Sequence, residues 1–282
     1  SHMRPQSTFS PGNESYIDID GNNQLLLIIS DNSMKMYTGD IDRLKHVINQ
    51  IVINMCKELD EPIKNKLVGK GAINPRDYRI DVYNCDPFLK LKPFTNPNYE
   101  YLSDIEGWSF LEGMNTADGR PYASQTFGVG GTLHVPRTSI CTYDITCNPD
   151  SNGGYLNESV FIHEFAHTIM EVGIKLAYPD WYEEFLDISK AFNEGVGSSI
   201  CPGQYHCDHR ELFAEASQIW FSATTRNDVV QFITTPNEMK YVINKKTKKS
   251  LYDYMYRIYG EPRKLCHEIE AFPNCKTKCR LT

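Results

Sequence analysis

The sequence lacks several features that would place it in a specialised class of protein. No run of about eighteen apolar residues occurs, so we do not expect a membrane span. Positive charge is not in excess: 29 Lys and Arg stand against 36 Asp and Glu, and the net charge of −7 argues against a nucleic-acid partner. The lysine run at 245–249 is interpreted as a solvated loop. Internal repeats, low-complexity tracts and shifts in composition that would mark a second domain are also missing.

The length and composition of the chain are typical of a soluble globular protein. It has 282 residues, of which 40% are apolar and 23% charged. We expect an expression scar at 1–3, a flexible polar lead-in that extends to 15, one folded domain over 16–264 and a cysteine-rich tail over 265–282.

Nine cysteines favour disulfide bonds over a structural zinc site. Cys141 and Cys147 are close in sequence, as are Cys201 and Cys207, and three more cysteines crowd the C-terminus. The C-x5-C spacing differs from the usual C-x2–4-C spacing of zinc ligands, so we predict local disulfides with one cysteine left free or paired between chains. Together with Asn-x-Ser sequons at 13–15 and 157–159, this composition predicts a secreted glycoprotein.

Hydrophobic periodicity predicts an α+β fold. Strands are expected at 16–20, 25–30 and 78–83, and a helix of period 3.6 runs from 41 to 59, before the break at 60–62. A strand, helix and strand in succession favour neighbouring parallel strands with the helix packed across them. Later helices are expected at 182–193, 209–221, 237–244 and 250–259, so a small mixed sheet should precede a mostly helical C-terminal lobe.

The segment 84–121 is rich in Pro, Asn, Asp and Gly and is expected to form long surface loops. Its aromatic residues, with Tyr122 just beyond it, have two interpretations. Trp108, Phe110 and Tyr122 either line a substrate cleft or, more commonly, anchor the loops by burial.

A glycine-rich segment at 127–135 is expected to be an edge strand. Glycines there permit close approach of another backbone, so Gly130, Gly131 and Thr132 are candidate substrate-binding residues for an extended peptide. The alternative is a bulge or a turn. His134 is interpreted as an outward-facing strand residue rather than a ligand.

The motif that carries chemistry is His163-Glu164-Phe-Ala-His167, an HExxH sequence within an apolar run. On a helix the two histidines share one face and can reach one metal ion, and Glu164 becomes a candidate general base. Asn157 is the expected N-cap and Gly173 the expected stop. The alternative is a core helix with two satisfied histidines.

A catalytic zinc ion takes three protein ligands and one water, so a third ligand is required. The metzincin pattern is excluded, because Met170 and Gly173 occupy the positions of its glycine and third histidine. Glu211 and Glu215 lie four residues apart on one helix, and Glu211 is preferred because an unpaired carboxylate in so apolar a helix would be costly. Competing carboxylates are Glu183, Glu184, Asp187 and Glu194.

The HEFAH motif, followed by a long spacer and Glu-Leu-Phe-Ala-Glu at 211–215, resembles the gluzincin group of zinc peptidases, and most closely the catalytic domains of the anthrax lethal factor family. The resemblance covers about residues 25 to 260 in the order of elements. It implies a zincin-like fold, with His163, His167 and Glu211 as ligands of one Zn²⁺ and Glu164 as the base. It also implies that Glu215 orients a ligand histidine.

In the lethal-factor-like enzymes a tyrosine just before the glutamate helix assists the transition state, and this resemblance implies that role for Tyr205. His206 and His209 are alternative oxyanion donors, and all three residues could instead simply pack in their loop.

The expected function is a zinc metallopeptidase, and specifically an endopeptidase, that acts on a peptide or protein substrate. Zinc would activate a water molecule and Glu164 would take its proton. Two alternatives remain open: a zincin-like binding module without catalysis, and a zinc amidase that acts on a non-protein amide.

Overall fold

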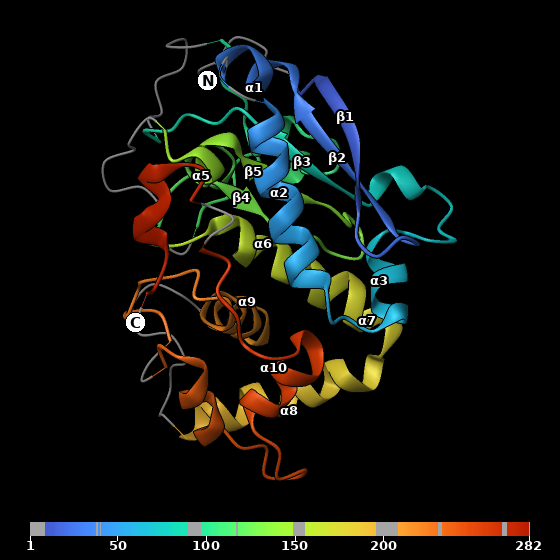
Figure 1. Cartoon of the computed structure of the whole chain (residues 1–282), viewed down its shortest axis with the longest axis vertical. Helices are drawn as coiled ribbons and strands as arrows, with labels where there is room; N and C mark the ends of the chain where they lie inside the picture. Colours follow the sequence, from blue (N-terminus) through green and yellow to red (C-terminus); the bar gives the residue numbers. More distant parts are fainter. Residues whose placement is uncertain are drawn as a thin grey trace.

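A five-stranded mixed sheet forms the upper half of the molecule (Figure 1). The order of its strands is β1-β2-β3-β5-β4, with β1 (Pro11–Asp18), β2 (Gln24–Ser30), β3 (Arg79–Tyr83), β4 (Gly128–Val129) and β5 (Thr138–Cys141). β1 and β2 form an antiparallel hairpin, β2, β3 and β5 are parallel, and β4 runs antiparallel to β5. Every residue of β2 after Gln24 is buried, as expected for an apolar strand covered on both faces.

The computed structural model describes residues 9–37, 39, 41–89, 97–116, 118–148, 156–195, 208–230, 233–266 and 270–281. The helices of this part of the chain are α1 (Asp31–Met36), α2 (Ile41–Cys56), α3 (Glu61–Leu67), α4 (Tyr122–Gln125), α5 (Thr142–Thr146), α6 (Val160–Thr168), the π-helix η4 (Ile169–Ile174), α7 (Lys175–Ala177), α8 (Pro179–Gly195), α9 (His209–Trp220) and α10 (Leu251–Tyr259). Short 3₁₀ helices are η1 (Pro75–Asp77), η2 (Leu102–Asp104), η3 (Ser109–Leu111), η5 (Pro236–Tyr241) and η6 (Pro273–Lys278).

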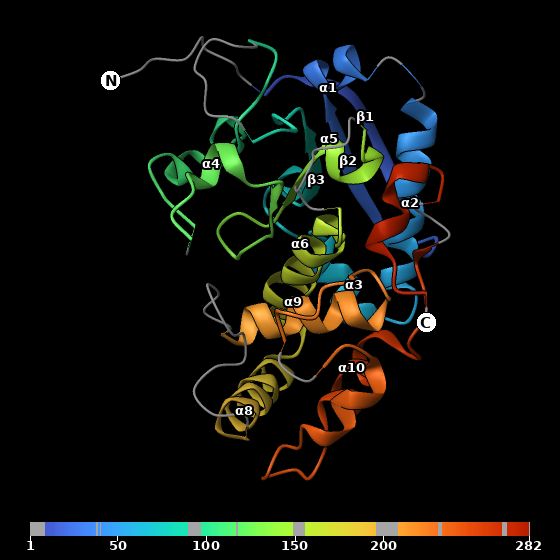
Figure 2. The same ribbon diagram turned by 90° about the vertical axis from the view of Figure 1, so that its left-hand side faces the viewer.

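Helix α6 lies between the sheet and α9 (Figures 1 and 2). Its residues Phe161, Ile162, Phe165 and Ala166 are almost fully buried, and α9 below it is buried from Leu212 to Trp220. Helices α8, α9 and α10 make up the lower half of the molecule (Figure 2). The two apolar helices α6 and α9 therefore join the sheet to the helical part.

The mixed α/β architecture agrees with the predicted α+β class, and the predicted parallel pairing of the second and third strands is confirmed. Three of the segments predicted from the sequence differ in the structure. Residues 11–15 are not a flexible lead-in, because they pair with β2 from Pro11 onward. Only Gly128 and Val129 of the predicted edge strand pair with β5, and the Thr132 N–H donates to the Val135 carbonyl in a turn, 2.9 Å away. The helix predicted at 237–244 is the 3₁₀ helix η5.

The ends of the HExxH helix also differ from expectation. Ser159, not Asn157, is the N-cap, because its hydroxyl accepts a hydrogen bond from the Ile162 N–H at 3.2 Å. Gly173 does not stop the helix, which continues through η4 and α7 to Ala177. A β-carbon at Gly173 would lie 2.9 Å from the side chain of Ile63, so this glycine permits α3 to pack closely.

The described residues form three disulfides, and two of them join cysteines that are far apart in the sequence. Cys85 bonds to Cys141 and Cys147 to Cys275, while only Cys266–Cys279 is a short-range pair. The expected pairing of neighbours is wrong for Cys141 because β3 and β5 are adjacent. Tyr83 pairs with Cys141 in register, which brings Cys85 alongside. Among the described residues Cys56 is a buried free thiol, and the predicted pair Cys201 and Cys207 lies outside them.

Across the described ranges, none of the helices is both long and apolar enough to cross a bilayer.

Candidate metal centre

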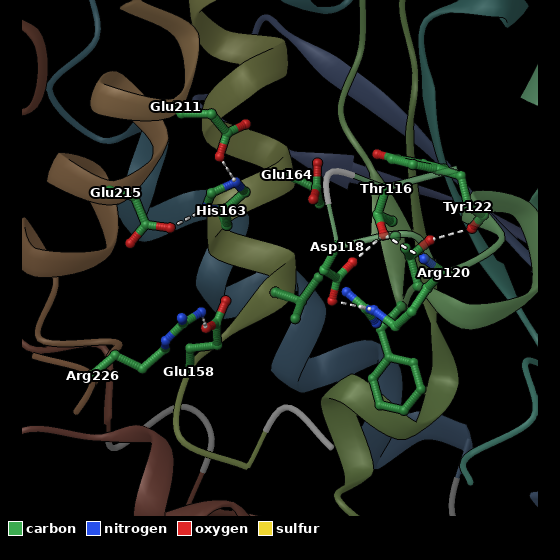
Figure 3. A pocket seen from close by; sticks show the side chains of 14 residues that line it. Thr116, Asp118, Arg120, Tyr122, Glu158, His163, Glu164, Glu211, Glu215 and Arg226 are labelled. Atoms are coloured by element: carbon green, nitrogen blue, oxygen red, sulfur yellow. Dashed lines mark hydrogen bonds and ion pairs between the residues drawn. The ribbon is translucent and has the colours of Figure 1, made fainter. Parts of the chain in front are cut away.

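The three predicted ligands, two from α6 and one from α9, come together, and Figure 3 shows His163 of α6 facing Glu211 of α9. The Nε2 atoms of His163 and His167 are 3.2 Å apart, and the Glu211 carboxylate lies 3.3 Å from the first and 3.0 Å from the second. Ligands bound at about 2.0–2.1 Å around a tetrahedral ion are roughly 3.3 Å from one another. The spacing of these nitrogen and oxygen atoms therefore fits one metal ion.

Two side chains of α9 contact Nδ1 of His163, the ring nitrogen that faces away from Glu211. Nδ1 of His163 lies 3.2 Å from a Glu215 oxygen and 2.8 Å from the Gln218 Oε1 atom. The Gln218 amide nitrogen donates to the Ser159 carbonyl at 3.0 Å, which turns its oxygen toward the ring. Since Nδ1 is occupied in this way, Nε2 is the nitrogen left to face Glu211.

The sequence predicted Glu215 in this position but missed Gln218. Gln218 follows Glu211 by two helical turns and Glu215 by one, and its side chain is fully buried. A polar amide on the same face as two glutamates within an apolar helix was the signal that could have identified it.

The charges of the cluster stabilise one another. Burial alone would lower the pKa of His163 and His167, but the Glu211 carboxylate more than offsets it and raises the pKa of both. Burial alone would raise the pKa of Glu211, yet the two imidazoles hold it well below its usual range.

Glu164 lies on the same helix, in the wall of a cleft of about 190 Å³ (Figure 3). Burial raises the pKa of this carboxyl, and the two histidines together with a hydrogen bond from the Gly130 N–H act in the opposite direction. The cleft is lined by Thr116, Asp118, Arg120, Tyr122, Thr126, Phe127, Gly128, Glu158, Val160, His163, Glu164, Glu211, Glu215 and Arg226.

The glycine-rich segment packs directly against the HExxH helix. A β-carbon at Gly130 would lie 2.4 Å from the β-carbon of His167, and one at Gly131 would lie 2.9 Å from the Thr168 hydroxyl. The Gly131 N–H donates to that hydroxyl at 2.8 Å. These glycines therefore permit close approach of α6. From the sequence, the partner that approaches them was predicted to be an extended peptide substrate.

The predicted substrate residues do not line the cleft. Gly130 and Gly131 are buried and Thr132 is exposed, and none of the three belongs to the cleft wall. Gly128, from the same segment, does line it. A role of Gly130, Gly131 or Thr132 in substrate binding stays a prediction.

The aromatic residues of the loops were predicted either to line a substrate cleft or to anchor the loops by burial, and the structure shows examples of both positions. Trp108 is buried and donates from its ring nitrogen to the Ser139 hydroxyl at 3.0 Å, so it anchors the loop. Tyr122 lines the cleft, and Phe110 is exposed.

The remaining candidates lie elsewhere. His209 contacts the Tyr182 hydroxyl at 2.8 Å and is absent from the cleft wall, and His134 is exposed. Tyr205 and His206 lie outside the described residues. The competing carboxylates are on α8, where Glu184, Asp187 and Glu194 pair with Arg257, Lys246 and Lys245, and Glu183 is exposed.

A group of histidine and glutamate side chains that could hold a metal ion is thus present at the junction of α6 and α9. Comparison of the chain with known protein families, with curated protein sequences and with solved structures finds no significant match.

Proposed function

We propose that this protein is a zinc-dependent metallopeptidase of the gluzincin type with a zincin-like catalytic domain. The observation that carries the proposal is the convergence of His163, His167 and Glu211 at separations of 3.0–3.3 Å. Glu164 lies beside them in the wall of a cleft.

Zinc suits this set of donor atoms. Two imidazoles and one carboxylate from the protein, with a fourth position left for water, are the ligands of many catalytic zinc ions. When bound, the zinc ion would lower the pKa of a water molecule and polarise a substrate carbonyl. His163 and His167 would hold the ion from α6 and Glu211 from α9.

Glu164 is the group that moves the proton. It takes a proton from the attacking water and, once the carbon–nitrogen bond breaks, passes it to the leaving amine. Burial raises the pKa of Glu164, and a carboxylate with a raised pKa is a stronger base. Glu215 and Gln218 keep His163 oriented during this exchange.

The cleft supports a peptide as substrate. Strand β4 ends the sheet, and its Gly128 and the preceding Phe127 line the cleft. An extended chain could add to this edge by main-chain hydrogen bonds and would then pass Glu164. Tyr205 or His206 would supply the oxyanion donor.

The proposed setting is extracellular. Three disulfides among the described residues support it, because such bonds persist in oxidising compartments and are rare in the cytosol.

Replacement of Glu164 by Gln tests the mechanism. The Glu164→Gln variant should bind zinc in the same stoichiometry, while kcat/KM falls by about 10²–10⁴-fold because the base is lost. The measurement is proteome-derived peptide cleavage profiling with the zinc-loaded protein, followed by kinetics on the best peptide.

Glu183→Gln is the matched control, because it makes the same change on an exposed face of α8. It should cleave like the parent. Equal cleavage by Glu164→Gln and the parent would refute the mechanism, and bound zinc without cleavage of any peptide would favour a binding module instead.

A further inference from the structure

A carboxylate from α5 caps the N-terminus of the HExxH helix. The first two N–H groups of α6, those of Val160 and Phe161, donate to the two oxygens of Asp144 at 3.1 and 2.8 Å. Together with the Ser159 hydroxyl, which accepts from Ile162, Asp144 satisfies the N–H groups of the first turn. Asp144 of α5 therefore fixes the helical turn that leads to His163.

The charge of Asp144 is balanced by Lys278. The Lys278 ammonium lies 2.5 Å from Oδ1 of Asp144 and donates to its main-chain carbonyl at 2.7 Å. Both side chains are almost fully buried, at 1% and 3% exposure. Within the part of the chain that the structure describes, Asp144 is seen to pair with no other cation. Removal of one partner of such a pair leaves a buried charge without compensation.

The cysteine-rich tail brings Lys278 to this position. Lys278 ends η6, which lies beside α5 (Figure 1), and the disulfide from Cys275 reaches Cys147 at the end of α5. The Thr277 hydroxyl donates to the Leu156 carbonyl at 2.7 Å, and the Arg280 N–H donates to the Ser222 carbonyl at 3.0 Å. The tail thus contacts the segment before α6 and the segment after α9, the two helices that carry the metal donors.

We propose that Asp144 and Lys278 are positioning residues of the metal centre, and that the C-terminal tail sets the zinc affinity through them. With Lys278 in place, the Asp144 carboxylate keeps both hydrogen bonds to the first turn of α6. His163 then lies one turn further on, in register with Glu211. The effects on zinc affinity and on catalysis rest on the proposed function, but the effect on the helix does not.

The test uses the full chain and a Lys278→Met variant, with Lys276→Met as control. Lys276 lies in the same 3₁₀ helix and is exposed, so the control makes the same chemical change without touching Asp144. Competition with a zinc chelator should give a dissociation constant about 10-fold higher for Lys278→Met, the lower end of the effect of groups that orient metal ligands. The constant for Lys276→Met should not change. On a cleaved peptide, kcat should fall with KM unchanged.

A second measurement is independent of zinc and of activity. Amide hydrogen exchange at the start of α6, over residues 160–163, should be faster in Lys278→Met than in Lys276→Met. If Lys278→Met does not fold, the double variant Asp144→Asn/Lys278→Met, which has neither charge, takes its place in both measurements and should show the same direction of change.

The outcomes separate the two proposals. Unchanged zinc affinity and unchanged exchange in the Lys278 variants would overturn the positioning role, even if the protein cleaves peptides. Absence of zinc binding by the parent would overturn the proposed function, and faster exchange in Lys278→Met would then still support the role of Asp144 and Lys278 in α6.

Discussion

Glu100 is a buried carboxyl that lies outside the candidate metal centre. Its Oε1 atom accepts from the Ser30 hydroxyl at 2.6 Å and from the Asn84 N–H at 2.7 Å, where β2 and β3 end. Burial raises the pKa of Glu100 to about 7, against the opposing effect of these hydrogen bonds. The folded protein therefore holds a proton that the unfolded chain has already lost at pH 6.

This shift predicts a dependence of stability on pH. The contribution of Glu100 is fully present below pH 4.5, the pKa expected when the chain is unfolded, and is lost as the pH rises through about 7. At about 1.4 kcal/mol for each pH unit, the loss amounts to about 3 kcal/mol. In Glu100→Gln this slope should vanish, because the amide keeps the accepting oxygen and cannot ionise.

The measurement is urea unfolding at intervals from pH 4 to 8, with Glu112→Gln at an exposed glutamate as control. The difference in unfolding free energy between Glu100→Gln and the parent should grow with pH. A constant difference over this range would show that Glu100 does not titrate between pH 4.5 and 7.

Among the elements, the contact between the glycine-rich segment and α6 governs where the two histidines lie. At Gly130 an added β-carbon would lie 2.7 Å from the Glu164 carbonyl oxygen as well as close to His167. Both contacts involve the main chain or a β-carbon, so a change of rotamer cannot relieve them. The position of the HExxH helix therefore depends on the absence of a side chain at this residue.

Gly130→Ala should destabilise the protein by about 3 kcal/mol, the upper part of the usual range for overpacking, and should weaken zinc binding. Gly39→Ala is the control, because its β-carbon would meet only the Tyr37 ring at 3.7 Å or more. Unfolding in urea and chelator competition measure the two effects. A Gly130→Ala protein with the parent's stability and zinc affinity would contradict this packing argument.

At the scale of the whole molecule, the candidate metal ligands come from both of its halves. His163 and His167 come from α6, against the sheet, and Glu211 comes from α9, in the helical part. Bound zinc would therefore stabilise the folded chain as a whole, since the unfolded chain does not bring these residues together.

Removal of the metal should lower the melting temperature. With free zinc at a thousand times its dissociation constant, the stabilisation is about 4 kcal/mol, which corresponds to a shift on the order of 10 °C for a chain of this size. The comparison is a melting curve with zinc and with a chelator, for the parent and for Glu211→Gln, whose response should be much smaller. An identical melting temperature of the parent under both conditions would count against a zinc site.

For the disulfides, closeness in the sequence gives the wrong pairing. Cys141 and Cys147 are six positions apart, yet their partners are Cys85 and Cys275, from separate segments. Strand adjacency selects the first pair, and the return of the C-terminal tail to α5 selects the second.

Features that depend on contacts between neighbouring residues could be predicted from the sequence. The apolar pattern of α2 and the alternation in β3 identified those elements, and the four-residue spacing of His163 and His167 put both on one face of a helix. A helix makes these contacts within one or two turns, so their prediction needs no knowledge of the fold. The preference for Glu211 over its rivals came from the cost of an unpaired carboxylate in an apolar helix, and Glu211 lies beside both histidines.

The residues from other elements that complete this cluster follow from how the chain packs and not from its sequence pattern. Gln218 turns toward His163, Asp144 accepts from the first turn of α6, and Lys278 compensates Asp144. Each pair joins residues from separate elements, whose distance is set by how the sheet, the helices and the tail pack. Periodicity in the sequence carries no information about that distance, because it describes one element at a time.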